Sequence, residues 1–159
     1  MAANNPAPPP GFNPEEAQNL EDMEKQFAVK VVQHMEIYWS ILEKVKGSTI
    51  RLTKFDDDIY DHVKKDFPEF DPAKTVSEDE MKSPEGKKRW REFMMQYEKQ
   101  IDDYNFGTMV RADPKTEYTQ YGTIFVPRMQ FYAIEILRNR AGLNDWIYEQ
   151  AQEAKAGKS

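Results

Sequence analysis

Apolar residues recur at spacings of three and four over most of this chain, which is the period of an amphipathic α-helix. The longest such run spans residues 14–46 and is followed by Gly47. Asn13 can cap this segment and Pro14 suits a first helical turn. The pattern therefore predicts one long helix, with a kink or break near Met35.

The same period predicts three further helices, over residues 53–67, 83–104 and 127–150. Thr53 and Asp56 can form a capping pair at the start of the first of them. Gly142 interrupts the last one. The acidic segment between the second and third helices has no strong period, so we expect a loop there with one helical turn at residues 78–81.

Two short β-rich runs, at residues 108–111 and 121–126, flank a polar stretch and predict a hairpin. A lone hairpin is marginal in water, so it must pack on the helices. The predicted fold class is α+β: a mainly helical single domain of about four main helices, with a two-stranded antiparallel hairpin before the last helix. We expect residues 14–150 to form the domain, residues 1–13 a disordered proline-rich tail, and residues 151–159 a frayed tail.

Composition then excludes several classes of protein. The 159 residues suit one domain. The chain has no Cys and two His, His34 and His62, which argues against disulfide scaffolds, thiol catalysis and Cys/His zinc sites. Apolar runs are short, so we expect no membrane span and a soluble, cytoplasmic protein. We also expect a monomer.

Charge is distributed unevenly along the chain, whose net charge is −6. Residues 1–86 carry 18 acidic and 10 basic side chains, and residues 87–159 carry 10 acidic and 12 basic ones. Nucleic-acid binding needs concentrated Lys and Arg, so we expect a protein partner and no nucleic acid.

The cluster Asp56–Asp58 is the main candidate for metal chemistry. An Asp-x-Asp arrangement could hold a divalent ion on a phosphate, which leaves a metal-dependent transferase or hydrolase as an alternative function. Consecutive helical side chains point about 100° apart, however, and acids in a first turn favour the helix dipole. We therefore expect no metal, no cofactor and no catalytic residue.

A polar stripe on the last helix is the main candidate for partner binding. Arg128, Glu135, Arg138 and Asn139 lie at offsets 0, 7, 10 and 11, which place them on one helical face. Its two arginines are multidentate donors suited to protein contacts. Residues that precede the hairpin could join this face. The predicted contact residues are Asn105, Phe106, Arg128, Gln130, Glu135, Arg138, Asn139 and Arg140.

One aromatic stripe and one acidic surface are further candidates for partner contacts. The stripe Trp90–Tyr97 could form a groove for a peptide, but its regularity predicts core, as does that of Phe27. The acidic surface over residues 56–80 is the alternative contact face, and it would suit a basic segment of a partner.

Several runs resemble the small eukaryotic family called polysaccharide biosynthesis domain-containing protein. They are D-Y-N-F-G-T at residues 103–108, the long run from Ile124 to Asp145, and shorter runs at residues 26–30, 51–60 and 66–71. The resemblance covers roughly residues 20–145. It implies a dedicated, non-enzymatic chaperone that holds the GTP-binding domain of newly made translation elongation factor 1-alpha. Ribosome-associated factors are a further possible partner, and a general protein-interaction scaffold stays a further alternative.

Overall fold

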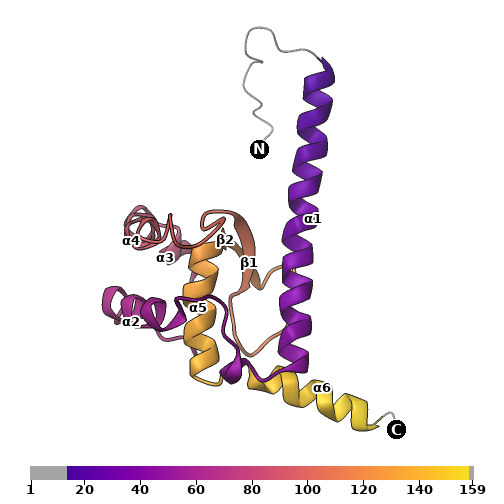
Figure 1. The fold of residues 1–159 in the computed structure, drawn as a ribbon, viewed down its shortest axis with the longest axis vertical. Helices are drawn as coiled ribbons and strands as arrows, with labels where there is room; N and C mark the ends of the chain where they lie inside the picture. The colour runs from indigo at the N-terminus through magenta and orange to yellow at the C-terminus, as the bar shows by residue number, and fades with distance from the viewer. Residues whose placement is uncertain (1–13, 158–159) are drawn as a thin grey trace.

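A computed structural model describes the backbone of residues 14–157, with side chains described at residue 25 and from residue 27 onward. Within this part of the chain there are six α-helices, one short 3-10 helix and a two-stranded sheet, which confirms the α+β class (Figure 1). The elements are α1 (Pro14–Lys44), η1 (Gly47–Thr49), α2 (Asp56–Asp66), α3 (Glu78–Met81), α4 (Pro84–Met95), β1 (Gly107–Arg111), β2 (Thr123–Pro127), α5 (Arg128–Arg140) and α6 (Asp145–Gly157). The predicted tail at residues 1–13 lies outside the described residues.

α1 is one continuous helix of 31 residues, without the predicted break near Met35. Its C-terminal half packs on the domain through Tyr38 and Leu42, which are 4% and 0% exposed. Its N-terminal half extends beyond the rest of the domain (Figure 1). Phe27 lies on this helix with 49% of its surface exposed, so the prediction that Phe27 belongs to the core is wrong.

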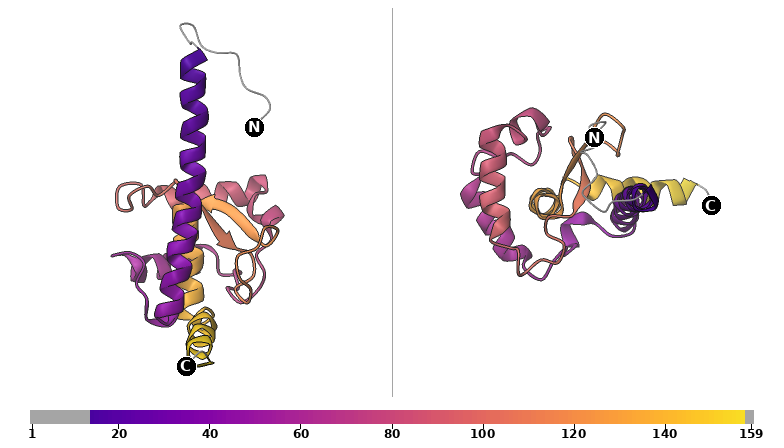
Figure 2. Two further views of the ribbon diagram at one scale, coloured as in Figure 1. Left: turned by 90° about the vertical axis from the view of Figure 1, so that its right-hand side faces the viewer. Right: turned by 90° about the horizontal axis from the view of Figure 1, so that it is seen from above.

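β1 and β2 form the predicted antiparallel hairpin, and Gly107 pairs with Pro127 while Met109 pairs with Phe125. The face that carries Val110, Ile124 and Val126 is buried in the core. Figure 2 shows α5 and the hairpin in the middle of the domain, with α2 and α4 on one side and α1 on the other. A hairpin of this size is stable only because helices cover it.

α2 begins three residues after the predicted start. Both carboxylate oxygens of Asp56 accept backbone hydrogen bonds, from the Leu52 and Thr53 N–H groups at 2.7 Å, so Thr53 and Asp56 do pair, but the helix begins at Asp56 rather than at Thr53. α4 begins as expected, since the Ser83 hydroxyl caps the Gly86 N–H at 3.1 Å. α3 confirms the predicted helical turn.

α4 ends at Met95, nine residues before the predicted end at residue 104. The chain continues as turns in which Tyr97 and Ile101 are still buried, each 6% exposed. These residues keep the apolar spacing that predicted a longer helix, because turns also repeat at about three residues per cycle. Trp90, in the middle of α4, is 6% exposed, which confirms it as a core residue.

α5 lies at the centre of the domain, and ten of its thirteen residues are buried. Gly142 has a φ of 74° and turns the chain after α5, so the last predicted helix is divided into two. α6 then packs against α1 and extends to Gly157. Residues 151–157, which the sequence predicts as part of a frayed tail, continue this helix in the structure.

Candidate functional site

Four of the eight predicted contact residues lie inside the domain. Gln130, Glu135, Arg138 and Asn139 are 4%, 1%, 0% and 2% exposed. The prediction that this polar stripe faces solvent is wrong. α5 is covered by α2, η1, α4 and the hairpin, and Tyr38 of α1 contacts it as well, so its polar face lies against other elements rather than water.

Glu135 is the centre of a buried hydrogen-bond network. One carboxylate oxygen accepts from the Tyr38 hydroxyl at 2.8 Å and from the Asn144 amide at 3.0 Å. The other accepts from the Arg138 guanidinium at 2.9 Å. Arg111, which is 1% exposed, lies 3.6 Å from the first oxygen. The network thereby joins α1, β1, α5 and the turn before α6.

Charge pairing determines the ionisation of this network. Burial alone would raise the pKa of Glu135, but the guanidinium groups of Arg138 and Arg111 and the hydrogen bonds from Tyr38 and Arg138 lower it overall. Burial, followed by the Glu135 charge, raises the pKa of Tyr38 well above its ordinary value. A carboxylate held ionised between two arginines is a structural ion pair, because none of these groups is open to a substrate.

Two members of the network escaped the sequence analysis. Arg111 ends β1, and its guanidinium donates to the carbonyl oxygens of Pro114 and Thr116 at 2.9 and 3.0 Å. Asn144 lies in the turn after Gly142 and donates to Asn139 at 2.7 Å. Neither residue belongs to an amphipathic pattern. Only the fold brings them beside the polar stripe, so the spacing of residues in the sequence does not identify them.

Two carboxylates of the acidic cluster already have partners within the chain. The Asp56 carboxylate is occupied by the backbone at the start of α2, and the exposed Asp57 carboxylate accepts from Arg140 and Arg51. Hydrogen bonds and charge from Arg140, then those from Arg51, lower the pKa of Asp57. Among the described residues, no group of three His, Cys, Asp or Glu is placed to hold a metal ion. Arg140 therefore acts locally, on α2.

Asn105, Phe106 and Arg128 are accessible from the surface and lie close to one another. The Arg128 guanidinium lies over the Phe106 ring, 5.4 Å from its centroid. Phe106 in turn approaches Phe27 of α1, with ring centroids 5.8 Å apart. Arg128 lies beside a hollow that we call the aromatic corner. It is lined by Phe27, Val31, Asp103, Asn105, Phe106, Gly107 and Phe125.

A second hollow continues from the aromatic corner. We call it the α4 groove: its apolar lining is Met81, Trp90, Met94, Met95, Tyr104, Phe125 and Pro127. Asn105 and Phe125 line both hollows, so the two form one surface. Met95 and Phe125 are 58% and 54% exposed.

The charged side chains that line the α4 groove are all basic. Lys82, Lys87 and Arg91 line it, and no acidic side chain does. Gln130 lines it as well, and its side-chain amide has no hydrogen-bond partner among the described residues. Gln130 is thus the one predicted contact residue that is buried and still available to a partner within the described structure.

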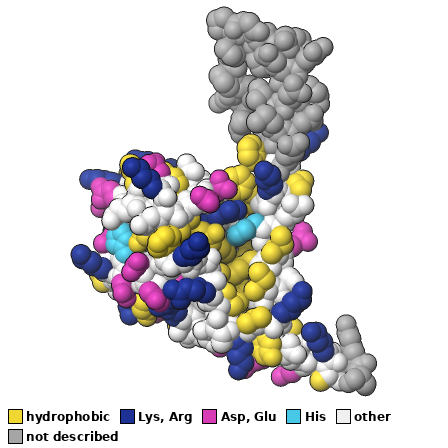
Figure 3. All heavy atoms as spheres, viewed as in Figure 1, with side chains coloured by type: hydrophobic (Ala, Val, Ile, Leu, Met, Phe, Trp, Pro, Cys, Tyr) yellow, Lys and Arg dark blue, Asp and Glu magenta, His cyan; other side chains and the backbone are white. Residues whose placement is uncertain are grey.

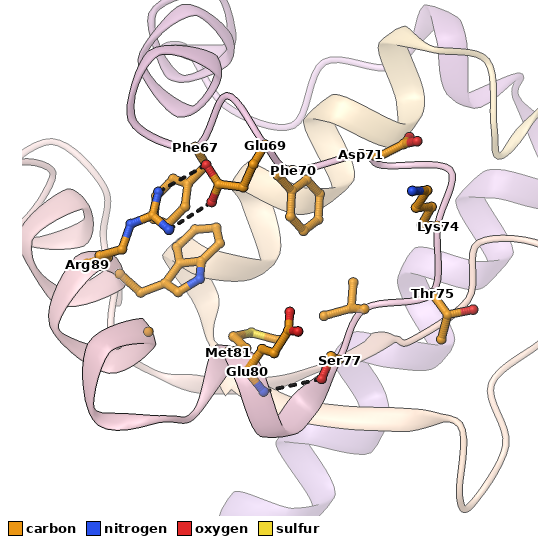
Figure 4. A pocket seen from close by; sticks show the side chains of 13 residues that line it. Phe67, Glu69, Phe70, Asp71, Lys74, Thr75, Ser77, Glu80, Met81 and Arg89 are labelled. Atoms are coloured by element: carbon orange, nitrogen blue, oxygen red, sulfur yellow. Dashed lines mark hydrogen bonds and ion pairs between the residues drawn. The ribbon is translucent and has the colours of Figure 1, made fainter.

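A third hollow lies between the acidic loop and α4 (Figure 4). The Arg89 guanidinium binds the Glu69 carboxylate at 2.8 and 3.2 Å and lies 4.6 Å from the Phe67 ring centroid. Trp90 stacks on Phe67 with centroids 4.1 Å apart. Arg89 is already paired, and its contacts with Glu69 and Phe67 anchor the loop on α4.

α1 carries most of the large apolar side chains that are exposed in the described part of the chain. They are Phe27, Val29, Val32, Ile37 and Ile41, and Val45 follows directly after the helix. Hydrophobic side chains gather along this helix and in the hollow beside it (Figure 3). The chain is rich in charged residues, with a mean hydropathy of −0.86, so this set of exposed apolar side chains is unusual for it. A broad apolar surface typically marks a contact site.

Fold and surface together define a small, mainly helical α+β domain with an uncovered apolar surface. The chain belongs to the PBDC1 family, because the family model described as PBDC1 protein matches residues 23–149. The names of the family and of its relatives state no enzymatic activity. No helix among the described residues has the length and apolar character needed to span a membrane.

Relatives from fungi and mammals resemble nearly all of the chain. A Schizosaccharomyces pombe relative, named Protein PBDC1 homolog, is 58% identical over 136 residues, which cover 84% of this chain and 92% of the relative. The human Protein PBDC1 is 38% identical over 140 residues, which cover 88% of this chain and 60% of the human protein. A solution NMR structure of a Saccharomyces cerevisiae protein, 54% identical, matches with a TM-score of 0.76 over 87% of this chain and 97% of that one.

Proposed function

We propose that this protein is a non-enzymatic chaperone for newly made translation elongation factor 1-alpha, which it binds through the GTP-binding domain of that factor. The resemblance of the runs at residues 103–108 and 124–145 supports this client. In the structure, the observation that supports the proposal most is the continuous apolar surface of the aromatic corner and the α4 groove. An incompletely folded domain exposes apolar segments, and such a surface can cover them.

The proposed mechanism needs no energy source. A surface that binds the unfinished client but not its folded form lowers the free concentration of aggregation-prone chains by mass action. Release follows when the client buries its own apolar segments. The rigid α5 network keeps the two hollows in place during this cycle, because it ties α1 and the hairpin together. The proposed site of action is the cytoplasm, with the protein acting as a monomer.

Co-purification from cells that are actively synthesising protein tests the proposal. A tagged chain should enrich nascent elongation factor 1-alpha above all other proteins, and blocking translation should remove that enrichment. Phe27→Ser with Phe125→Ser should reduce the yield of client. Tyr121→Ser is the matched control, since Tyr121 is an exposed aromatic, at 92%, that lines neither hollow. Recovery of many unrelated partners would instead indicate a general scaffold.

A further inference from the structure

We propose that the α4 groove binds an extended apolar segment of the client that carries acidic side chains. This inference rests on the proposed function and names the chemistry that the site recognises. Three observations carry it: an apolar floor, lining residues whose charged members are all basic, and a side-chain amide without a hydrogen-bond partner.

The floor fits alternating apolar side chains. Met94 and Met95 lie at the end of α4 beside Phe125 of β2. Methionine side chains are flexible and polarisable, so they adapt to apolar groups of different shapes. Such a floor selects apolar residues without demanding one sequence, which suits a segment that has not yet found its own fold.

The rim selects acidic flanks by charge. Lys82 is paired with Glu78 at 2.9 Å, while Lys87 and Arg91 have no ion-pair partner among the described side chains. An acidic segment gains attraction at this rim, whereas a basic one is repelled. Residues 1–13 of this chain contain no Asp or Glu, so its own N-terminus lacks the required chemistry.

Gln130 explains why the segment must be extended. Its amide offers one acceptor and two donors, which match the N–H and C=O of a peptide group. A helix or a finished sheet has already paired these backbone groups, and an extended, unfolded segment has not. The groove can therefore distinguish an unfinished client from a folded one.

Peptide titration with the purified full chain tests the inference without the client. The probe is a fluorescein-labelled short peptide in which leucine and valine alternate with glutamate, followed by fluorescence anisotropy. Its analogue with lysine in place of glutamate should bind at least tenfold more weakly. Lys87→Glu with Arg91→Glu should weaken binding of the acidic probe at least tenfold. The control, Lys65→Glu with Lys155→Glu, makes the same change in net charge on α2 and α6 and should leave binding within twofold.

Gln130→Leu separates recognition from a structural role. Leucine removes the unpaired amide at similar volume, so the melting temperature should stay the same or rise while affinity for the acidic probe falls at least threefold. Equal binding of the acidic and basic probes, or unchanged affinity in both groove variants, overturns the proposal. A concentration-dependent dimer that Lys87→Glu with Arg91→Glu dissociates would assign the groove to a second copy and also overturn it.

The two proposals fail in different ways. If the GTP-binding domain of elongation factor 1-alpha binds the native chain and the Lys87→Glu, Arg91→Glu variant equally, the groove assignment is wrong and the chaperone function stands. If the acidic probe binds in the groove and that domain does not bind at all, the client is wrong and the groove assignment stands.

Discussion

The ring of Phe125 lies against the α-carbon of Gly107 on the facing strand. A Cβ atom at position 107 would overlap three carbons of that ring. The two residues are diagonal neighbours on one face of the hairpin, since Gly107 pairs with Pro127 and Phe125 with Met109. Glycine at position 107 therefore fixes the position of an aromatic ring that lines both the aromatic corner and the α4 groove.

Gly107→Ala should displace this ring without unfolding the domain. Phe125 is 54% exposed, so its ring can move toward solvent, and the free energy of unfolding should change by no more than about 1 kcal/mol. Client affinity should fall because the junction of the two hollows is altered. Chemical denaturation and a binding titration on the same preparation measure both quantities. A variant with full affinity would show that the ring position does not matter.

Trp90 and Phe27 should respond in opposite ways to truncation. Trp90 is buried against Phe67 and Phe93, and Trp90→Ala should cost about 3–5 kcal/mol of the free energy of unfolding. Phe27 is half exposed, so Phe27→Ala should cost about 1 kcal/mol or less and mainly weaken client binding. Thermal melts and client titrations of both variants check this contrast, and a strongly destabilised Phe27→Ala would contradict it.

The sequence pattern predicts which helices and strands form better than it predicts what surrounds each of them in the fold. The strands, the turn at α3 and the start of α4 follow from local signals such as the Ser83 cap. The end of α4 does not, because the turns after Met95 preserve the apolar spacing that a longer helix would have. The pair of Thr53 and Asp56 shows the reverse case, in which the predicted contact forms but the helix begins only at its second residue.

The candidate site was only partly accessible to sequence reasoning. A polar stripe on a helix normally faces water, but α5 is surrounded by other elements, so Glu135, Arg138 and Asn139 form an internal network. Contacts with residues far away in the sequence decide whether this face is buried. The spacing of residues within one helix contains no information about those contacts. Asn105 and Phe106 are at the surface as expected, while Met95 and Phe125 were missed because exposure is a property of the whole fold.

Glu135 should be among the most sensitive positions of the core. Glu135→Gln leaves two buried guanidinium groups without a counter-charge, and breaking such a pair costs about 3–5 kcal/mol. Tyr38→Phe removes only the hydroxyl that bonds Glu135 and Asn139, and it should cost about 1–3 kcal/mol. Denaturant titrations of both variants test this order, and a Glu135→Gln variant as stable as the native chain would contradict it.

The pH dependence of stability should report on the same network. The folded-state pKa of Glu135 lies below its ordinary value of 4.5, so the unfolded chain binds this proton more readily. The contribution of Glu135 to stability is therefore fully present above pH 4.5 and is lost as pH falls through the folded-state pKa. Tyr38→Phe should make this loss shallower, as measured by unfolding at a series of acidic pH values. An identical acid profile in the two proteins would contradict the coupling.

Asp57 and Asp58 should be dispensable for function. Asp57→Asn with Asp58→Asn removes exposed carboxylates, of which Asp57 binds only the side chains of Arg51 and Arg140. The fold and client binding should be retained, and Mg²⁺ or Mn²⁺ should not shift the melting temperature of the native chain. A metal-induced shift that disappears in the double variant would restore the metal-dependent transferase or hydrolase as the function.

Reconstituted translation tests the central claim most directly. The GTP-binding domain of elongation factor 1-alpha is synthesised from purified components with increasing amounts of this protein, and the soluble fraction that binds GTP is measured. The account predicts that this fraction rises with the native chain and with the Tyr121→Ser control, and rises much less with Phe27→Ser, Phe125→Ser. An equal yield at every concentration of the native chain would contradict the proposed function.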